Sequence, residues 1–513
     1  MKTSSFANSP LLTGRILRFL PLLAILLATF AVYGSSLGHD FLTGWDDPAY
    51  VTDNEAIRGI TFENLKTAFT SIYVGNYAPI QIISYMIDYS LWGLKPFGFI
   101  LTNLLLHAGS GIFLYLILEH LYGKNIWIFF ATLIFLLHPV QVETVVWVSQ
   151  RKTLLAMFFF LPSWYWYMRY RETPSGGTAH YAMSLGAFTL ALLAKSVAVI
   201  LPPLLLLFNL SFKDRQKRSA APYDLLPYIL LAGGVALLAL KSQNVEYDGG
   251  REFHHLGNSR YTTLLTMLPV LARYLGMLFM PINLSAWYSP AVRTVMDAQV
   301  AWSIALSVML LAVGLILWVR KRDLFFWYAV FFLGLVPVSQ IVPLITLMND
   351  RYMYFPMLGA APFVSSLLYG MTVRQGLTNS GRRNVYVIIF TVMVGLCGMT
   401  SLKRADVWKD SVTLWTDAAA KCPDADTVHN GLGFALLAAG RVDEAIKELW
   451  LALKLNPNTA ETWNQLGAAY GRIGDYDKAV YAFETVLLLD PNSEIGRRNL
   501  SEANAKKMQP PRK

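Results

Sequence analysis

The sequence is short of charge and of cysteine. Only 15% of its 513 residues are Asp, Glu, Lys or Arg, whereas 55% are apolar and the mean hydropathy is +0.41. Several apolar runs reach at least 18 residues, which excludes an ordinary soluble fold and predicts a polytopic membrane protein. The two cysteines lie in an apolar run (Cys397) and in a polar segment (Cys422), which argues against a disulfide framework and against a thiolate metal site.

Acids are fewer than bases, with 33 Asp and Glu against 43 Lys and Arg, and the net charge is +10. Most bases lie in short segments that flank apolar runs, as the positive-inside rule predicts, so the charge does not indicate nucleic-acid binding. Lys2, Arg15 and Arg18 precede an apolar stretch from Phe19 to about Leu37. Since that stretch is long enough to span, we interpret it as an uncleaved signal anchor with a cytoplasmic N-terminus.

The apolar runs and their flanking charges predict an all-α membrane domain over 1–402 with eleven spans. These are 17–38, 98–118, 125–142, 152–168, 180–195, 196–212, 223–241, 300–319, 324–343, 354–372 and 385–402. An odd number of spans places the C-terminus outside. Two further apolar pieces are interpreted as interfacial helices: Pro79 to Leu94 in a first outer loop (39–97), and Leu264 to Met280, which could also be re-entrant, in a second (242–299).

The few charges within these apolar regions fall at the predicted outer turns. The candidates are His138, Glu143, Arg151, Lys152, Lys195, Arg351 and the neighbouring Tyr352. A charge in hydrocarbon costs about 2.5–3.5 kcal/mol unless it is paired or hydrated, so Lys195 suggests a function, with snorkelling to the interface as the alternative. The cations suit an anionic headgroup or a phosphate leaving group, and they could also be plain surface turns. His138 and Glu143 could act as acid, base or metal ligand, or only orient their neighbours.

A carboxylate pair, Asp46 and Asp47, follows the first predicted span directly. A carboxylate whose pKa is tuned by nearby charges can act as a general base on an acceptor proton. The alternative is an interfacial turn in which Asp47-Pro48 breaks the loop. The sequence leaves the two interpretations equally open.

The C-terminal part is polar and repeats with a period of 34 residues. The second copy of the pattern contains Trp463, Leu466, Gly467, Tyr470, Ala479, Phe483 and Pro491, and the first contains His429, Leu432, Gly433, Leu436, Ala445, Leu449 and Pro457. This pattern predicts tetratricopeptide repeats over 403–505, with a partial copy upstream and a disordered tail at 506–513. Asn430 and Asn464 occupy equivalent positions and could grip a peptide in the concave groove, or they could be solvated polar residues.

Taken in order along the chain, several short motifs resemble a known family. They are Asp40-Phe41, Trp45-Asp46-Asp47, Tyr77-Ala78-Pro79, Pro96-Phe97-Gly98-Phe99, Asn103 with His107, His138-Pro139 with Glu143, Leu193-Ala194-Lys195, and Asp350-Arg351-Tyr352 with Tyr354 and Pro356. This order resembles the transmembrane and tetratricopeptide repeat-containing O-mannosyltransferases and their bacterial relatives. The chain departs from the eukaryotic members in having about two and a half repeats and in Ala78, where a basic residue is common.

The resemblance implies a glycosyltransferase of the GT-C superfamily, acting at the outer face of a bacterial inner membrane. Such an enzyme moves a sugar from a polyprenyl-phosphate donor to a hydroxyl acceptor, here expected to be protein Ser or Thr. Asp46 or Asp47 would be the base, and the superfamily allows the pair to hold a divalent cation. Lys195, Arg351, Arg151 and Tyr352 would face the donor phosphate, His138, Glu143 and Tyr77 would orient the site, and the repeats would present a polypeptide. A lipid or glycan flippase and a non-catalytic scaffold that displays the repeats are the alternatives.

Overall fold

The computed structural model describes residues 10–174, 177–217, 222–243, 256–373 and 379–509. Within these ranges the chain is helical, and the only extended pairing is an isolated bridge between Tyr73 and Asn76. The chain divides into two compact units. Unit 1 comprises Met1–Gly38, Asn54–Ile282 and Ala291–Asp406, and unit 2 comprises His39–Asp53, Asn283–Pro290 and Val407–Lys513. The all-α prediction is therefore confirmed.

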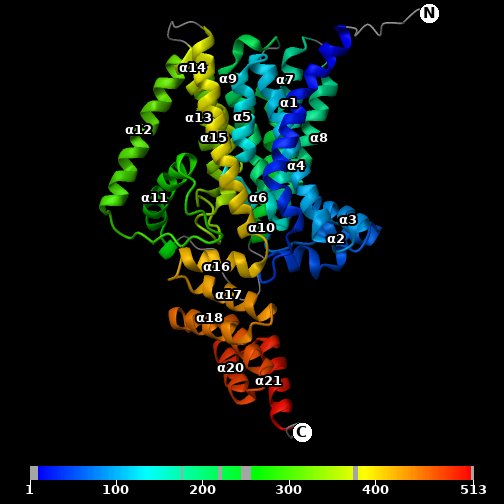
Figure 1. Cartoon of the computed structure of the whole chain (residues 1–513), viewed down its shortest axis with the longest axis vertical. Coiled ribbons are helices and arrows are strands. Elements are labelled where there is room, and N and C mark those ends of the chain that lie inside the picture. The colour runs from blue at the N-terminus through cyan, green and yellow to red at the C-terminus, as the bar shows by residue number, and fades with distance from the viewer. Residues whose placement is uncertain (1–9, 175–176, 218–221, 244–255, 374–378, 510–513) are drawn as a thin grey trace, which may run out of the picture. The chain divides into compact units, whose positions relative to one another are not determined.

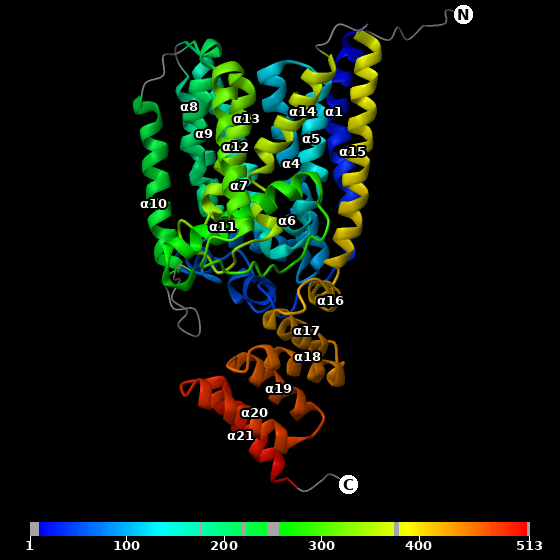
Figure 2. The same ribbon diagram turned by 90° about the vertical axis from the view of Figure 1, so that its left-hand side faces the viewer.

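Unit 1 is a bundle of apolar helices (Figure 1). Its helices are α1 (Pro10–Tyr33), α2 (Phe62–Thr70), α3 (Pro79–Trp92), α4 (Pro96–Tyr122), α5 (Ile126–Leu137), α6 (Val142–Val146), α7 (Arg151–Glu172), α8 (Thr178–Ala194), α9 (Leu201–Ser211), α10 (Leu226–Gln243), α11 (Arg260–Phe279), α12 (Ala298–Arg320), α13 (Arg322–Leu335), α14 (Met357–Val373) and α15 (Asn379–Val407). The core lies where α7 packs on α4 and α8, and α5 on α4 and α14. Figure 2 shows the bundle from the side; the last helix of unit 1, α15, approaches α1 where a Cβ atom on Gly398 would lie 3.3 Å from the Val32 side chain.

Six helices among the described residues are long and apolar enough to cross a membrane. They are Phe19–Gly38, Pro96–Tyr122, Tyr223–Ser242, Arg260–Phe279, Ala298–Arg320 and Asn384–Val407. A pair bent by 47°, Ile126–Leu137 and Pro139–Val146, would make a seventh span. The chain is a multi-pass membrane protein.

Judged by helix length and composition, the described residues provide six spans, or seven with the bent pair, and not the eleven that the sequence predicts. The predicted spans 180–195, 196–212 and 354–372 correspond to shorter apolar helices, and α13 has only 14 residues. The segment interpreted as interfacial, Leu264 to Met280, lies in α11, which is long enough to span. Whether α11 crosses decides the parity of the crossings, so the outside position of the C-terminus stays a prediction.

Short helical turns occupy the places where the sequence predicts the apolar hairpins to turn. Between α5 and α7 the chain forms Pro139–Gln141, α6 and Val148–Gln150, and between α8 and α9 it forms Ser196–Ile200. A third turn, Asp350–Met353, precedes α14 and contacts α6, while Ser196–Ile200 contacts α7. The first two turns therefore lie at α7, and the third lies at α6, which precedes α7 in the chain.

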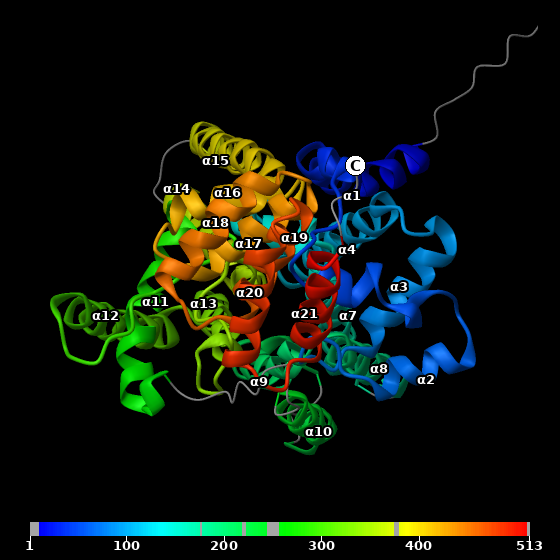
Figure 3. The ribbon, with the colours of Figure 1, turned by 90° about the horizontal axis from the view of Figure 1, so that it is seen from below.

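Unit 2 contains α16 (Ser411–Lys421), α17 (Asp426–Ala438), α18 (Val442–Leu455), α19 (Ala460–Arg472), α20 (Tyr476–Leu489) and α21 (Glu494–Lys507). Each of these helices packs on the next, as Figure 3 shows from below. The small residues of the repeat allow this approach, because a Cβ atom on Gly467 would lie 2.6 Å from the Phe483 ring. Helix α21 extends to Lys507, two residues into the predicted tail, and residues 510–513 lie outside the described part.

Candidate functional site

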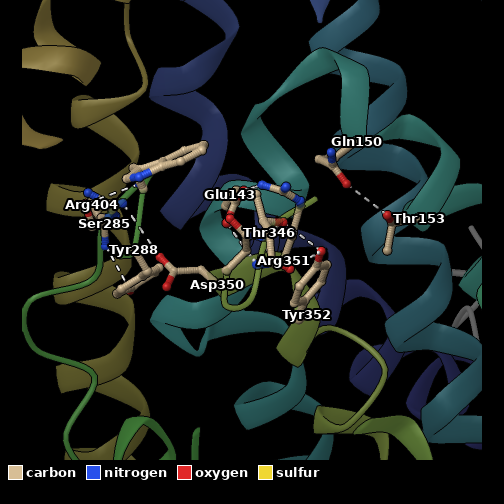
Figure 4. A network of polar contacts seen from close by, with 12 residues as sticks. Glu143, Gln150, Thr153, Ser285, Tyr288, Thr346, Asp350, Arg351, Tyr352 and Arg404 are labelled. Atoms are coloured by element: carbon tan, nitrogen blue, oxygen red, sulfur yellow. Dashed lines mark hydrogen bonds and ion pairs between the residues drawn. The ribbon is translucent and has the colours of Figure 1, made fainter. Parts of the chain in front are cut away.

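Lys195 lies at the break between α8 and the helical turn Ser196–Ile200. Its ammonium group donates a hydrogen bond to Thr153 Oγ1 at 2.8 Å. Thr153 in turn donates to Gln150 Oε1 at 3.1 Å (Figure 4). This chain of donors ties Lys195 to the first turn of α7. The side chain is half-buried and stays at this break, where Thr153 holds it. This position argues against snorkelling, in which the side chain would extend along a helix to the membrane interface.

A pocket in unit 1 opens beside Lys195. Its empty volume is about 380 Å³, including the part open to solvent. Residues from four segments line it: Asn76 and Tyr77 before α3, Lys152 in α7, Lys195 and Ser196 after α8, and Ser242 in α10. Two ammonium groups from different segments thus line one small pocket, together with hydroxyl and amide groups. Such a lining favours an anionic ligand with several acceptor oxygens.

Tyr77 is half-buried at this pocket, outside the candidate spans. Burial raises the pKa of its phenol above the ordinary value of 10.0, so the group keeps its proton at neutral pH. The pocket therefore offers a neutral hydroxyl donor beside its two cations. The sequence predicts Tyr77 and Lys195 as site residues, and the structure places both on the lining of this pocket.

Arg151, adjacent to Lys152, is buried in an ion pair. Its guanidinium lies 2.7 Å from Asp88 Oδ2, and both side chains are at most 3% exposed. It also donates to Asn103 Oδ1, to the Phe99 carbonyl and, at 3.3 Å, to Ser84 Oγ. Because these groups use the donors of Arg151, its contacts favour a structural role over binding of a phosphate.

The turn that precedes α7 is fixed by the same elements. Asn103 in α4 donates to the carbonyls of Val145 and Trp147 at 3.1 and 3.2 Å. In α3, Tyr85 donates to the Val148 carbonyl at 2.8 Å and Gln81 to the Ser149 carbonyl at 3.1 Å. These bonds hold the start of α7, and thus Lys152, against α3 and α4.

A second network joins α6 to the Asp350–Met353 turn, as Figure 4 shows. The fully buried carboxylate of Glu143 accepts from the Arg351 backbone N–H at 2.9 Å and pairs with the Arg351 guanidinium. The guanidinium also lies over the rings of Trp147 and Tyr352, 5.6 and 5.5 Å from their centroids. Arg351 keeps 13% exposure, so it combines a fixed position with partial access.

Other predicted site residues serve local contacts. His138 is buried; its Nε2 lies 3.2 Å from the Leu278 carbonyl, and its Nδ1 accepts from the Val140 N–H at 3.4 Å. The Tyr352 hydroxyl lies 2.8 Å from Thr346 Oγ1. Both residues hold neighbouring segments together.

Sequence reasoning missed two ion pairs, that of Asp88 with Arg151 and that of Arg404 with Asp350. Arg404 lies 3.6 Å from Asp350, and both are buried. Isolated acids and bases within apolar segments, such as Asp88 and Arg151, were the available signal, since buried charges need partners. Their pairing could not be read from sequence separations of 54 to 63 residues.

The acidic pair belongs to unit 2, in its His39–Asp53 segment. Trp45 stacks on Trp408 and Trp415 with centroids 6.0 and 5.0 Å apart, and the Thr43 N–H donates to Ser411 Oγ at 2.8 Å. Gly44 has φ +73°, and a Cβ there would lie 2.5 Å from the Phe434 ring, so this position needs glycine. The loop is thus built onto α16 and α17.

The two aspartates differ in what they contact. Asp47 is 1% exposed, and its Oδ2 accepts from the Leu42 N–H at 2.8 Å, which closes the loop. Asp46 is half-buried, and the described residues provide no hydrogen-bond partner for its carboxylate. Asp46 is therefore the better placed of the two to act on a ligand.

The described residues contain no group of three or more His, Cys, Asp or Glu side chains that could hold a metal ion. Asp46 and Asp47 supply two carboxylates, and one oxygen of Asp47 is already used by the loop. The residues present do not form a metal centre by themselves, so we derive no step through a divalent cation.

In the repeats, the predicted pair of asparagines has unequal surroundings. Asn464 Oδ1 accepts from Asn499 in α21 at 2.9 Å, so this position contacts the terminal helix. Asn430 Oδ1 is buried without a partner among the described residues. They do not form the same contact twice, as an even ladder would require.

Two family models match the C-terminal helices. The family described as "Tetratricopeptide repeat" matches residues 460–493, and the one described as "TPR repeat" matches residues 435–474. Unit 2 carries tetratricopeptide repeats. The 34-residue period predicted from the sequence is thereby confirmed.

Most of the chain is similar to protein O-mannosyl-transferases. The Caenorhabditis elegans protein O-mannosyl-transferase F38B6.6 is 22% identical over 475 residues, covering 88% of this chain and 65% of that protein. The human protein O-mannosyl-transferase TMTC1 is 21% identical, covering 76% of this chain and 49% of its own length. The chain thus spans less than two thirds of these relatives. Among solved structures, an Archaeoglobus fulgidus oligosaccharyltransferase is 13% identical with a TM-score of 0.42, covering 79% of this chain and 57% of that chain.

Proposed function

We propose that the protein is an inverting membrane glycosyltransferase of the GT-C type, which moves a sugar from a polyprenyl-phosphate donor to a hydroxyl acceptor. The observation that carries this proposal is the pocket lined by Lys152, Lys195 and Tyr77. It has the charge and the hydrogen-bond donors for a phosphate. The described residues include six helices long and apolar enough to cross the membrane in which a polyprenyl chain would lie. The names of the relatives make mannose the first sugar to test.

In this proposal the pocket binds the phosphate of the donor. When the bond between the anomeric carbon and the phosphate oxygen breaks, its electron pair passes to that oxygen, and the phosphate gains negative charge. Fixed cations stabilise this charge more in the transition state than in the bound donor, which lowers the barrier. Lys195 and Lys152 have this role, and Tyr77 donates a hydrogen bond. Arg351, which Glu143 positions outside the pocket lining, is the further cation that we propose for the same charge.

Asp46 is the proposed general base. Its carboxylate takes the proton of the acceptor hydroxyl, and the oxygen attacks the anomeric carbon from the side opposite the phosphate, which inverts the configuration. Asp47 positions this carboxylate by closing the loop through the Leu42 N–H. The tetratricopeptide repeats present a polypeptide acceptor with Ser or Thr, or dock a partner.

We propose further that the N-terminus is cytoplasmic and that the reaction and the repeats lie on the outer side of a bacterial inner membrane. The test uses a background with Cys397 and Cys422 replaced by serine. Asn492→Cys, in the exposed turn after α20, should react with an impermeant thiol reagent in intact spheroplasts, whereas Lys124→Cys, before α5, should react only after lysis. The reverse pattern would contradict the orientation.

The function is tested first by binding, because binding of undecaprenyl phosphate does not depend on the sugar. The full chain in nanodiscs should bind this lipid phosphate, and Lys195→Met should weaken binding about tenfold or more, the scale of one charge-assisted hydrogen bond. Lys241→Met removes an exposed lysine one residue from the pocket and should have no effect. Absent binding, or equal binding by both variants, would refute the proposal. Transfer of labelled mannose from undecaprenyl-phosphate-mannose to a peptide that contains Ser and Thr then tests turnover.

A further inference from the structure

Besides the pocket in unit 1, the structure has a hollow in the repeats of unit 2, at the end of α18 and the start of α19. Its empty volume is about 780 Å³, including the part open to solvent, and it is lined mainly by apolar atoms from Trp450, Leu451, Pro457 and Trp463. Trp450 and Leu451 are 45% and 43% exposed. With Pro457 and Trp463 these two side chains form one contiguous apolar patch, and such patches are the surfaces at which proteins bind partners.

The walls of this hollow, which we call the Trp450 hollow, are preformed. The Trp450 and Trp463 rings meet edge to face at 82° with centroids 5.8 Å apart. Trp463 Nε1 donates to the Pro457 carbonyl at 2.8 Å, and Trp450 Nε1 donates to the Tyr470 hydroxyl at 2.9 Å. Because both indole N–H groups are satisfied within the repeat, the hollow presents ring surface and asks an occupant only for apolar contact.

The rim of the hollow is positive. Lys447 and Lys454 line it and lie seven residues apart on α18, on the face that carries Trp450 and Leu451. Two acids of α18 are engaged elsewhere, since Glu444 pairs with Arg441 and Glu448 with His429. An occupant with negative charge on both sides of an apolar group would therefore match the surface.

The repeat fold does not require this combination. One period of 34 residues later, the positions of Lys447, Trp450, Leu451 and Lys454 are held by Tyr481, Glu484, Thr485 and Leu488. Helix α20 forms and packs with these residues in place. The Trp450 hollow is thus a feature of one repeat and not of the fold.

We propose that the Trp450 hollow docks a peptide segment in which an aromatic or large aliphatic side chain is flanked by Asp or Glu. The apolar side chain fills the space between Trp450 and Trp463, and the acids pair with Lys447 and Lys454. Seven helical residues span about 10 Å, which an extended peptide covers in about three residues. The two acids are accordingly about three residues apart, with the anchor between them.

The test selects ligands from a random 12-residue peptide library displayed on phage, using the full chain in nanodiscs. Counter-selection against the Trp450→Ala chain leaves the sequences that need the hollow. The proposal expects these to carry an apolar anchor between acids at the stated spacing. A selected peptide should lose about tenfold or more in affinity with Trp450→Ala, as for a central aromatic anchor, and should weaken as salt rises.

Charge exchange supplies the control. Lys447→Glu/Lys454→Glu should bind the acidic peptide at least about tenfold more weakly and should prefer the same peptide with lysines in place of its acids. Leu488→Glu, at the position equivalent to Lys454 in the next repeat, should leave binding unchanged. The proposal is overturned if no Trp450-dependent sequence emerges, if the selected sequences lack acids, or if the exchanged pair fails to restore binding. Self-association of the chain that Trp450→Ala abolishes, without peptide selection, would also overturn it in favour of a second copy.

Discussion

The ion pair around Arg151 and the pocket beside Lys152 adjoin each other in unit 1, yet they use positive charge in opposite ways. Arg151 is fully buried, and an acid, an amide and a carbonyl neutralise and hold it. Lys152 follows it on the helix and lines the pocket that Lys195 shares. In our proposal the first cation fixes the start of α7 so that the second faces the donor phosphate at a defined place.

The same division occurs in unit 2 between Asp46 and Asp47. Asp47 is buried and accepts from the Leu42 backbone N–H, whereas Asp46 is half-buried beside it. In each pair one charge builds the local structure and its neighbour is presented by that structure. Mutations within each pair should therefore have effects of different kinds, on stability for one residue and on activity for the other.

The largest effect is expected at Asp46. Asp46→Asn keeps the volume and removes the proton acceptor, so sugar transfer should fall by about 10²–10⁴-fold, with the melting temperature and the binding of undecaprenyl phosphate unchanged. Asp47→Asn should lower the melting temperature as well, because it weakens the loop closure. A radiolabelled transfer assay and thermal unfolding in detergent distinguish the two. Equal defects in both assays for both variants would remove the proposed division of roles.

Arg151→Met should destabilise the fold by about 3–5 kcal/mol, because Asp88 would remain buried without its partner. Adding Asp88→Leu should restore much of this loss, since the double variant buries no charge. Unfolding monitored by intrinsic fluorescence in detergent gives the comparison. A single variant as stable as the native chain would show that the pair is not structural.

Lys195→Met and Lys152→Met should have a smaller effect of a different kind. Each removes one charge-assisted contact to the donor phosphate, so donor affinity should fall about tenfold while stability changes little. The KM for the donor and the melting temperature measure the two quantities, with Lys241→Met as the matched exposed lysine. A lower melting temperature with unchanged donor affinity would show that these lysines have a structural role, like that of Arg151.

The smallest effect is expected for an exposed pair in the repeats. Hydrogen bonds from the Lys478 side chain and backbone hold the pKa of Asp475 below its ordinary value. The stability from this carboxylate is present above its unfolded pKa and is lost as pH falls through the lower folded value. Asp475→Asn should therefore shift the melting temperature slightly at pH 7, and not at all at a pH well below the lowered pKa, where the carboxyl is neutral in both the folded and the unfolded chain. A shift as large as that of Arg151→Met would break the contrast between buried and exposed pairs.

The sequence by itself determined the helical class, the membrane character, the repeats and the turns that carry charge, because all of these follow from local periodicity and composition. It also named Lys195, Tyr77 and Glu143. It could not determine the number of spans, since α8, α9 and α13 are shorter than a membrane is thick and α11 is ambiguous by charge alone.

Only the tertiary structure decided which charges belong together. Arg151 and Lys152 are indistinguishable in sequence, as are Asp46 and Asp47, because adjacent residues share the same local pattern. The two cations separate through partners far along the chain, Asp88 for Arg151 and the second lysine of the pocket for Lys152. The two aspartates separate by burial, since Asp47 is 1% exposed and Asp46 is half-buried. The physical reason is that a charge acquires its role from burial and pairing, and both are set by packing between helices and not by neighbours in the sequence.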